Sequence, residues 1–439
     1  MKEMIRRMDT AVLGAAGVAK ALDRPSSAVD PEIHRRVEEI VAAVRDKGDA
    51  ALLELTERFD RVSLTSADLA VTPAEMAAAE RASGEATMRA LRYAAGRIER
   101  FHRESAPRSW RMTDSMGSRL GQDVRPIDRV AVYVPGGRAA YPSTVLMTVI
   151  PARVAGVREI VLVSPPSADK SLNSAVLAAA RVAGVTEAYR VGGAQAVAAL
   201  AYGTETIRRV DKIVGPGNIY VALAKSRVFG DVGIDMVAGP SEIVVVADES
   251  ADAAFVAADL LAQAEHDPMA RAVLLTPSRA LIDGVVSEAQ RQLARLPRRE
   301  IAAASLEAHG AVVLTRTLEE AVEVANLMAP EHLELQVEDP EALLQMVRNA
   351  GAVFLGRMTP EVVGDYVAGP NHVLPTGGTA RFASALGTED FVKRMSVIQY
   401  TQAGLKDAAP HLAELARVEG LDGHGAAATA RIERTGGTT

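Results

Sequence analysis

The 439-residue chain contains no cysteine, and aromatic residues make up only 4% of it. Without cysteine it has no disulfide, no thiolate nucleophile and no cysteine-ligated zinc. This composition also fits a cytosolic protein. Because aromatic side chains are scarce, we expect a core composed mostly of Ala, Val and Leu. The length is sufficient for two or three domains.

Long apolar runs and an excess of positive charge are also missing. No stretch reaches the roughly 18 consecutive apolar residues that a membrane-spanning helix needs. Residues 1–24 are basic at Arg6 and Arg7 and then mildly apolar, but Lys20 interrupts this stretch and no small-residue cleavage site follows it. We therefore expect a cytoplasmic protein without a secretory signal. The formal net charge of -7 argues against nucleic acid as a main partner.

Strands alternate with helices from Arg129 to about residue 355. The apolar run Val130–Val134 leads through Pro135-Gly136-Gly137 into a helical segment, and the same order recurs along the chain. This alternation predicts two α/β units with parallel sheets and helices on both faces. We also expect one long polar helix over about 73–105 and a helical region after about 387.

Three glycine turns follow predicted strands of the first α/β unit, at 135–137, 192–195 and 215–218. Parallel sheets bind ligands where strands feed helices, so three turns at one sheet edge would form the floor of a cofactor cleft. The Gly-x-Gly-x-x-Gly fingerprint is missing, which weakens the case for a standard dinucleotide fold. Each turn by itself is more often only a tight turn.

An acid and a histidine stand side by side in the stretch Ala329-Pro330-Glu331-His332-Leu333-Glu334-Leu335. The pattern predicts a short apolar strand entered through a proline. Glu331 and His332 can both move protons near neutral pH once a pocket tunes them. The alternative is an ordinary surface pair at a strand edge.

Residues of the metal-ligand type occur in three separate segments. Gln263 and His266 lie three apart on a predicted helix, so they share a face, and an amide oxygen and an imidazole nitrogen can both bind a divalent metal. A histidine that interacts with the helix dipole is the alternative. Asp365 precedes the turn 369–372, and His424 lies far along the chain. Spacing alone does not join these four residues, and we interpret His372 as a residue that shapes the turn.

Together these motifs resemble the histidinol dehydrogenase family over nearly the whole chain, least in the first 25 residues. The motifs that carry the resemblance are Val132-Tyr133-Val134-Pro135-Gly136-Gly137, Val191-Gly192-Gly193-Ala194-Gln195-Ala196, Val214-Gly215-Pro216-Gly217-Asn218, Ala238-Gly239-Pro240-Ser241-Glu242, Gln263-Ala264-Glu265-His266, Ala329-Pro330-Glu331-His332-Leu333-Glu334, Gly364-Asp365-Tyr366, Gly369-Pro370-Asn371-His372-Val373-Leu374-Pro375-Thr376 and Glu419-Gly420-Leu421-Asp422-Gly423-His424.

The resemblance implies an α/β fold of two incomplete Rossmann-like domains with parallel sheets. The first would comprise residues 26–131 and 241–386 and hold the metal and catalytic residues. The second, 132–240, would bind NAD. A small N-terminal arm, 1–25, and a helical C-terminal appendage, 387–439, would complete the chain. In the family the appendage reaches the partner subunit, so we expect a homodimer with shared active sites.

The resemblance also implies roles for individual residues. Glu331 and His332 would be the acid–base pair, and one Zn²⁺ and NAD would be the cofactors. The expected zinc ligands are Gln263, His266, Asp365 and His424. The expected NAD contacts are Tyr133, Gln195 and Asn218. The expected substrate contacts are Ser241, His332, Asp365 and Glu419, together with the metal ligands Gln263, His266 and His424.

The expected reaction is oxidation of L-histidinol to L-histidinal and then to L-histidine, the last steps of histidine biosynthesis, with one NAD reduced in each step. The absence of cysteine agrees with this, because many aldehyde oxidations use a thiohemiacetal that this chain cannot form. One alternative is a related enzyme for another short alcohol, such as a sulfonated diol, although Glu419 favours a substrate with a positive charge. A second alternative is a non-catalytic protein that binds a metal or nucleotide.

Overall fold

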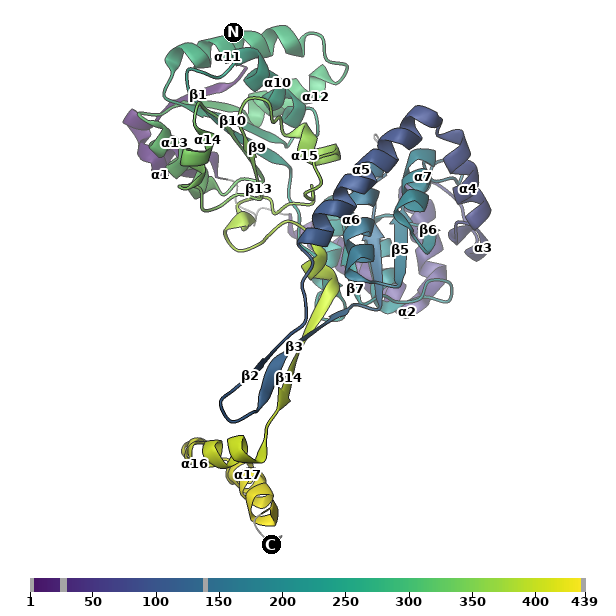
Figure 1. Ribbon diagram of the computed structural model, residues 1–439. Helices are drawn as coiled ribbons and strands as arrows, with labels where there is room; N and C mark the ends of the chain where they lie inside the picture. Colours follow the sequence, from purple (N-terminus) through teal and green to yellow (C-terminus); the bar gives the residue numbers. More distant parts are fainter. Residues whose placement is uncertain (1–3, 24–29, 137–140, 436–439) are drawn as a thin grey trace. The chain divides into compact units, whose positions relative to one another are not determined.

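The computed structural model describes residues 4–23, 30–136 and 141–435. The chain divides into two compact units, one formed by Met1–Ser105 and Asp128–Phe391 and the other by Ala106–Ile127 and Val392–Thr439. The first unit contains two parallel sheets, and the second contains one antiparallel sheet (Figure 1). Gly137 of the expected cofactor turn lies outside the described residues, as do residues 1–3, 24 and 25 of the expected arm.

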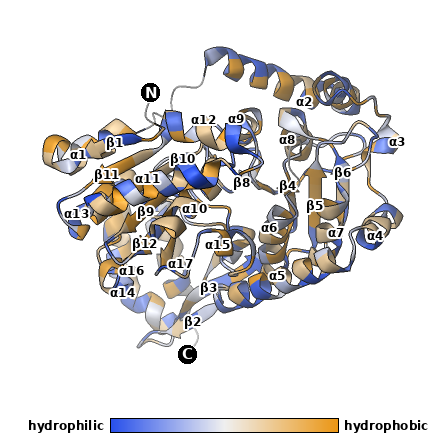
Figure 2. Cartoon of the chain, turned by 90° about the horizontal axis from the view of Figure 1, so that it is seen from above, coloured by the Kyte–Doolittle hydropathy of each residue, from blue (hydrophilic) through white to orange (hydrophobic). Residues whose placement is uncertain are grey.

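The larger sheet of the first unit has six parallel strands in the order β1-β11-β10-β9-β12-β13. Strands β9 and β10 in its middle are almost entirely apolar and buried on both faces, as is typical of a parallel sheet covered by helices on both sides, and the apolar character of the strands is visible in Figure 2. The bounds are β1 (Arg6–Asp9), β9 (Glu242–Ala247), β10 (Arg271–Thr276), β11 (Ala311–Leu314), β12 (His332–Gln336) and β13 (Ala352–Leu355).

Two sets of helices enclose this sheet in separate apolar cores. One core contains side chains of α10, α11 and α12, and the other contains side chains of α1, α13 and α14. Side chains cap the amino ends of several of these helices; Asp252 caps α10 and Thr317 caps α13. The bounds are α1 (Thr10–Leu22), α10 (Ala253–Ala264), α11 (Arg279–Leu293), α12 (Arg299–His309), α13 (Leu318–Met328) and α14 (Pro340–Leu344).

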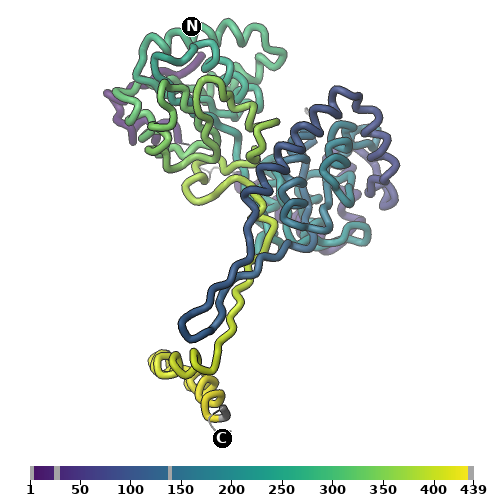
Figure 3. The backbone as a smooth tube through the Cα atoms, viewed as in Figure 1, coloured from purple at the N-terminus to yellow at the C-terminus, as the bar shows by residue number. Residues whose placement is uncertain are grey.

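The N-terminal residues, which we expected to form a small arm, contribute a strand and a helix to this sheet. β1 pairs in parallel with β11, and Figure 3 shows the purple N-terminal segment within the green part of the chain. Val18 and Leu22 of α1 are buried in the core shared with α13. The sequence did not reveal β1 because its four residues, Arg-Arg-Met-Asp, lack an apolar pattern.

The smaller sheet has five parallel strands in the order β6-β5-β4-β7-β8. The predicted α/β alternation is thus confirmed for both sheets. The strand bounds are β4 (Arg129–Tyr133), β5 (Glu159–Ser164), β6 (Glu187–Arg190), β7 (Lys212–Val214) and β8 (Gly233–Ile234). The helices that follow these strands are α6 (Pro142–Ala155), α7 (Ser174–Ala183), α8 (Gly193–Tyr202) and α9 (Ile219–Val228).

Residues 31–104 form helices that belong to the smaller sheet, whereas our expected domain division placed them with the larger one. Val37, Val44 and Leu52 share an apolar core with β4, β5 and α8. The expected long helix is two helices, because Gly84 between them has a φ of 74°. The bounds are α2 (Pro31–Asp60), α3 (Ser66–Leu69), α4 (Pro73–Ala82) and α5 (Glu85–Glu104).

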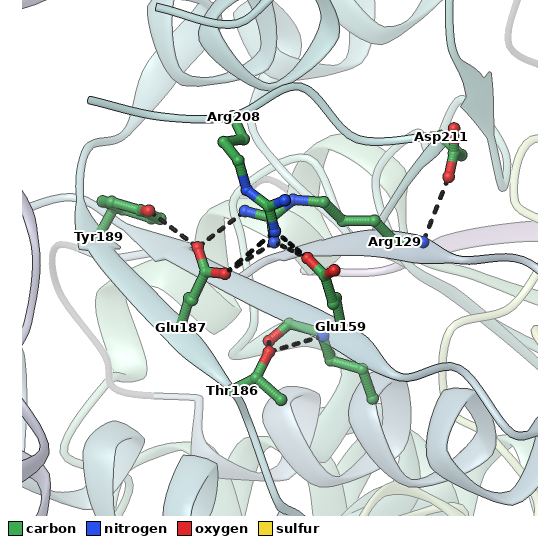
Figure 4. Close-up of polar contacts among 8 residues, drawn as sticks. Arg129, Glu159, Thr186, Glu187, Tyr189, Arg208 and Asp211 are labelled. Atoms are coloured by element: carbon green, nitrogen blue, oxygen red, sulfur yellow. Dashed lines mark hydrogen bonds and ion pairs between the residues drawn. The ribbon is translucent and has the colours of Figure 1, made fainter. Parts of the chain in front are cut away.

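A charge cluster around Arg129 joins the first residues of three strands of the smaller sheet (Figure 4). The buried Arg129 guanidinium donates to Glu159 at 2.5 Å and to both oxygens of Glu187 at 2.7 Å. Tyr189 also donates to Glu187, and Arg208 pairs with Glu159. Chiefly through the hydrogen bonds from Arg129, the pKa of Glu187 falls to about 2. This cluster therefore consists of opposite charges that compensate each other.

The second unit contains the antiparallel sheet β14-β3-β2 and two helices. We expected the chain after about 387 to be helical, but β14 precedes the helices. None of its residues is fully buried, so it has no apolar face that would reveal it in the sequence. The bounds are β2 (Trp110–Thr113), β3 (Arg119–Pro126), β14 (Val392–Gln399), α16 (Gln402–Glu419) and α17 (Asp422–Thr435). Among the described residues, no helix has the length and apolarity needed to cross a membrane.

Candidate active site

The Glu331-His332 pair lies where the chain enters β12. Helix α13 ends at Ala329, whose φ of 48° is left-handed, and Pro330 then leads into the strand. β12 lies between β9 and β13, so it is not an edge strand. Glu331 is 5% exposed and His332 is 4% exposed. The alternative of an ordinary surface pair is therefore excluded.

The hydrogen bonds of His332 define its tautomer. Its Nδ1 lies 3.1 Å from the carbonyl oxygen of Glu242, which can only accept, so Nδ1 carries the proton. Burial lowers the pKa of His332 to about 4, so the ring is neutral near pH 7. Nε2 then holds a lone pair and lies 3.4 Å from Oε1 of Glu361. His332 is thus prepared to accept a proton or to bind a metal at Nε2.

Glu331 is held by the turn before β9. Its Oε2 accepts the backbone N–H of Glu242 at 2.9 Å, and the Ser241 side chain also hydrogen-bonds to it. Burial nevertheless raises the pKa of Glu331 well above that of an exposed carboxyl. An ionised Glu331 is consequently a stronger base than a surface carboxylate.

Gln263 lies in the last turn of α10, but His266 follows the end of that helix, so the prediction that both residues share one helix was wrong at His266. Gln263 is fully buried, and neither atom of its amide has a hydrogen-bond partner among the described residues. The Nδ1 of His266 lies 3.0 Å from the carbonyl oxygen of Ala262, which again leaves Nε2 as the lone-pair nitrogen. That Nε2 is 3.8 Å from Oδ2 of Asp365.

Asp365 lies on the short helix α15 (Val362–Tyr366), and Glu361 precedes that helix. One ligand atom each from His332, Glu361 and Asp365 lie within 4.8 Å of one another, a spacing that can hold a metal ion. Both carboxyl oxygens of Glu361 are buried without a hydrogen-bond partner among the described residues. Burial, and then the nearby Asp365, raise the pKa of Glu361 to about 10.

Glu361 is the functional candidate that sequence reasoning missed. The available signal was its spacing of four residues from Asp365, which places both carboxylates on one face of a helix. The helix has only five residues, however, so no apolar periodicity marked it. His372 also joins the site, since its Nδ1 donates to the carbonyl of Asp365 at 3.0 Å and its Nε2 lies 3.3 Å from Oγ1 of Thr144 in α6.

The expected cofactor contacts gather at the carboxyl ends of β4, β6 and β7. Tyr133, Gln195 and Asn218 line one cavity of about 1260 Å³ together with Asp60 and residues of α2. The hydroxyl of Tyr133 accepts the N–H of Gly193 at 3.0 Å, and Gln195 donates to Asp60 at 3.5 Å. The side-chain oxygen of Asn218 caps α9. Asp60 is a residue of this cavity that sequence reasoning did not single out.

The two remaining expected site residues lie in the second unit. Glu419 is the last residue of α16, and His424 lies in the first turn of α17. Both are exposed. The first unit thus brings together Ser241, Glu331, His332, His266 and Asp365. Tyr133, Gln195 and Asn218 line a separate cavity, and Gln263 is joined to His266 only by its backbone carbonyl. Glu419 and His424 belong to the second unit.

Comparisons with known proteins give one consistent result. The family model for histidinol dehydrogenase matches residues 22–432. The histidinol dehydrogenase of Geobacillus kaustophilus is 58% identical over 403 residues, which are 92% of this chain and 95% of that protein. That of Cupriavidus pinatubonensis is 50% identical over 98% of both chains. The crystal structure of histidinol dehydrogenase from Elizabethkingia anophelis matches with a TM-score of 0.94 at 35% identity, covering 99% of this chain and 100% of that one. The chain belongs to the histidinol dehydrogenase family.

Proposed function

We propose that this chain oxidises L-histidinol through L-histidinal to L-histidine, the last steps of histidine biosynthesis, with two molecules of NAD and one Zn²⁺ per subunit. The observation that carries the proposal is the buried group of Glu331, neutral His332, Glu361 and Asp365, in a chain whose relatives at 50–58% identity are named histidinol dehydrogenases.

The donor atoms of the site fit a divalent metal. The amide of Gln263 and the carboxylate of Glu361 are buried without hydrogen-bond partners among the described residues. Such groups are costly unless something binds them. The lone-pair Nε2 of His266 and the carboxylate of Asp365 lie beside each other, 3.8 Å apart. Nitrogen and oxygen donors of this kind suit zinc.

Two overlapping ligand sets meet at Asp365. The set that we propose is Gln263, His266, Asp365 and His424 of the partner subunit. A second group, His332, Glu361 and Asp365, also has the spacing of a metal site, and it shares only Asp365 with the proposed set. We prefer the first set because His332 is then left to transfer protons and Glu361 is left to contact the substrate amine or a water molecule.

When bound, zinc would orient the substrate through its imidazole and amine, and NAD would accept a hydride in each oxidation. The neutral His332 accepts the alcohol proton at Nε2, while its Nδ1 stays hydrogen-bonded to the carbonyl of Glu242. Glu331, with its raised pKa, takes a proton from the water that attacks the aldehyde. Ser241 and the N–H of Glu242 keep its carboxylate in place.

The cavity around Tyr133, Gln195 and Asn218 is the proposed NAD site. It lies at the carboxyl ends of parallel strands, where nucleotides bind in such sheets. Its volume of about 1260 Å³ is ample for a dinucleotide. The cysteine-free chain has no thiol for the aldehyde step, so water activation by Glu331 is the route that its residues supply.

We further propose a homodimer in which Glu419 and His424 complete the partner's site. Large apolar side chains are exposed on α16, which carries Glu419: Leu415 is 65% exposed and Val418 is 68% exposed. Apolar surface of this kind is typical of an interface.

The test is to mix and reassort two inactive variants, His332→Ala and His424→Ala. Shared sites predict that activity returns to about a quarter of wild type, because half of the dimers are mixed and each has one intact site. No recovery would contradict the shared site.

The first test of the reaction is the yield of NADH from L-histidinol at completion with zinc present. Two NADH per alcohol are expected, and one would show that oxidation stops at the aldehyde.

The Glu331→Gln variant tests the assigned roles. It should slow the oxidation of L-histidinal more than that of L-histidinol, because only the second step needs an activated water. Equal losses in both steps would contradict the role of Glu331.

A further inference from the structure

Strand β12 departs from the pattern of a buried parallel strand. Its residues His332, Glu334 and Gln336 face one side of the sheet, and Leu333 and Leu335 face the other. All five are buried. The leucines belong to the apolar core around α13, as expected. The other face instead places the buried carboxylate of Glu334 and the buried amide of Gln336 on the same side as His332. Strands of a parallel sheet that is covered on both faces are usually apolar at such positions.

The carboxylate of Glu334 is bonded in two directions. Its Oε1 accepts the backbone N–H of Glu361 at 2.8 Å, and its Oε2 accepts Nε2 of Gln336 at 2.7 Å. The same Nε2 donates to Oδ2 of Asp259 in α10 at 2.7 Å. Burial and the adjacent Asp259 raise the pKa of Glu334 to about 8, and burial raises the pKa of Asp259 as well. The two carboxyls are therefore best satisfied when they share a proton.

These hydrogen bonds connect three elements of the first unit that carry candidate metal and catalytic residues. Asp259 belongs to α10, which also carries Gln263. Glu334 belongs to β12, which begins with His332. Glu361 introduces α15, which carries Asp365. α15 has only five residues and no buried side chain, so its own packing holds it weakly. Gly364 of that helix lies against Phe354 of β13, where a Cβ would come within 2.7 Å of the ring.

We propose that Glu334 is a positioning residue, which fixes α15 to β12 and α10 through the N–H of Glu361 and so sets the spacing of His332, Glu361 and Asp365. This inference rests on the proposed metal-dependent function. Glu334 itself contacts neither metal nor substrate. Its carboxylate acts as a cap for α15, in the way that an acceptor satisfies the first N–H groups of a helix.

The test compares Glu334→Gln with a matched variant, Leu335→Val, in the same strand. In Glu334→Gln, only the oxygen of the new amide can accept a hydrogen bond. If this oxygen accepts the backbone N–H of Glu361, the amide nitrogen faces Nε2 of Gln336, and two donors then oppose each other. Leu335→Val removes one buried methylene from the opposite face and leaves the polar network intact. Zinc affinity is measured by competition with a chromogenic chelator, and amide hydrogen exchange is measured in the peptide covering residues 359–367.

Glu334→Gln should weaken zinc binding by about 10- to 100-fold and speed exchange in 359–367 roughly tenfold. Leu335→Val should change neither, although it lowers the melting temperature. In the double variant Glu334→Gln/Gln336→Glu, the amide at 334 can accept from the N–H of Glu361 and donate to the carboxylate at 336. That carboxylate and Asp259 then share one proton. It should recover most of the affinity and of the protection from exchange.

The positioning role is overturned if Glu334→Gln exchanges like wild type in 359–367, or if Leu335→Val produces the same changes. The exchange readout needs no metal. If the wild-type chain takes up no zinc while Glu334→Gln still loosens 359–367, the proposed metal function fails and the positioning of α15 stands. If zinc binds to wild type and variant equally, the positioning role fails and the metal function stands.

Discussion

The carboxylates beside Arg129 and those beside His332 differ in what faces them. Glu159 and Glu187 meet the guanidinium of Arg129, whose terminal nitrogens are both paired. No Lys or Arg among the described residues forms an ion pair with Glu331, Glu361 or Asp365; the partners are histidines that burial keeps neutral or that lie nearly 4 Å away. A buried acidic cluster without its own cation is costly. The missing positive charge is what a metal and a cationic substrate would supply, so we propose that the same residue type is structural in one cluster and functional in the other.

The largest effect that separates the two clusters is expected for His332→Gln. The new amide can still donate to the carbonyl of Glu242, so folding should be retained, but no group then accepts the alcohol proton. We expect kcat to fall by about 10²- to 10⁴-fold, measured as NADH formation at saturating L-histidinol. His102 is another buried histidine whose ring nitrogens have no hydrogen-bond partner in the described chain, and His102→Leu is the control. An equal loss of kcat in both variants would mean that the effect is structural.

Arg129→Met should produce the opposite result, a loss of stability with kcat retained. The substitution leaves Glu159 and Glu187 without their main donor, although both are partly exposed and can be rehydrated. We therefore expect the free energy of unfolding to fall by about 2 kcal/mol, near the value of hydrogen bonds to charged groups. Urea unfolding measures this loss. A variant of full stability but low activity would show that the Arg129 cluster is not merely structural.

The sequence predicted the two α/β sheets but only part of what surrounds them. Strands β9 and β10 were found because both of their faces are buried. β2 and β14 were missed because they expose most of their residues, and β3 was missed because only one of its residues is fully buried; none of the three carries a clear apolar alternation. The N-terminal strand β1 was missed because its four residues are mainly polar.

The candidate site was only partly visible for a related reason. Motif resemblance selected Gln263, His266 and Asp365, and spacing joined only the first two. The expectation that ligands bind at the carboxyl ends of strands fits the cavity at Tyr133. Glu331, His332 and Glu242 instead stand at the amino ends of β12 and β9. No local rule points there, because the site depends on which strands become neighbours, and that is decided by long-range pairing of β9 with β12.

Gln263→Leu tests whether a single buried amide of the candidate site destabilises the protein when no metal is bound. Removing a buried amide that lacks partners should stabilise the metal-free protein by about 1 kcal/mol, because an unsatisfied polar group costs free energy. Zinc affinity should fall at the same time. Urea unfolding with a chelator present measures the first effect and chelator competition the second. Gln336→Leu is the matched control, since its amide donates to Glu334 and Asp259 and its loss should destabilise. If Gln263→Leu also destabilises the metal-free chain, its amide has a structural partner.

The smallest effect concerns Asp60, which lines the proposed cofactor cavity and forms no ion pair with a Lys or Arg of the described residues. Burial raises its pKa from 3.8 to about 6. The folded state therefore binds the Asp60 proton more tightly than the unfolded state. The free energy of unfolding that this protonation contributes is fully present below pH 3.8 and is lost as the pH rises through about 6. Asp60→Asn carries no such charge. Its melting temperature relative to wild type should rise between pH 4 and pH 7 and then stay level, with a gain below about 1 kcal/mol because Asp60 is only partly buried. Asp46→Asn, an exposed change on the same helix, is the control. A difference that is flat from pH 4 to pH 7 would show that Asp60 is solvated or has a cationic partner, and the contrast with the Arg129 cluster would not extend to the cofactor cavity.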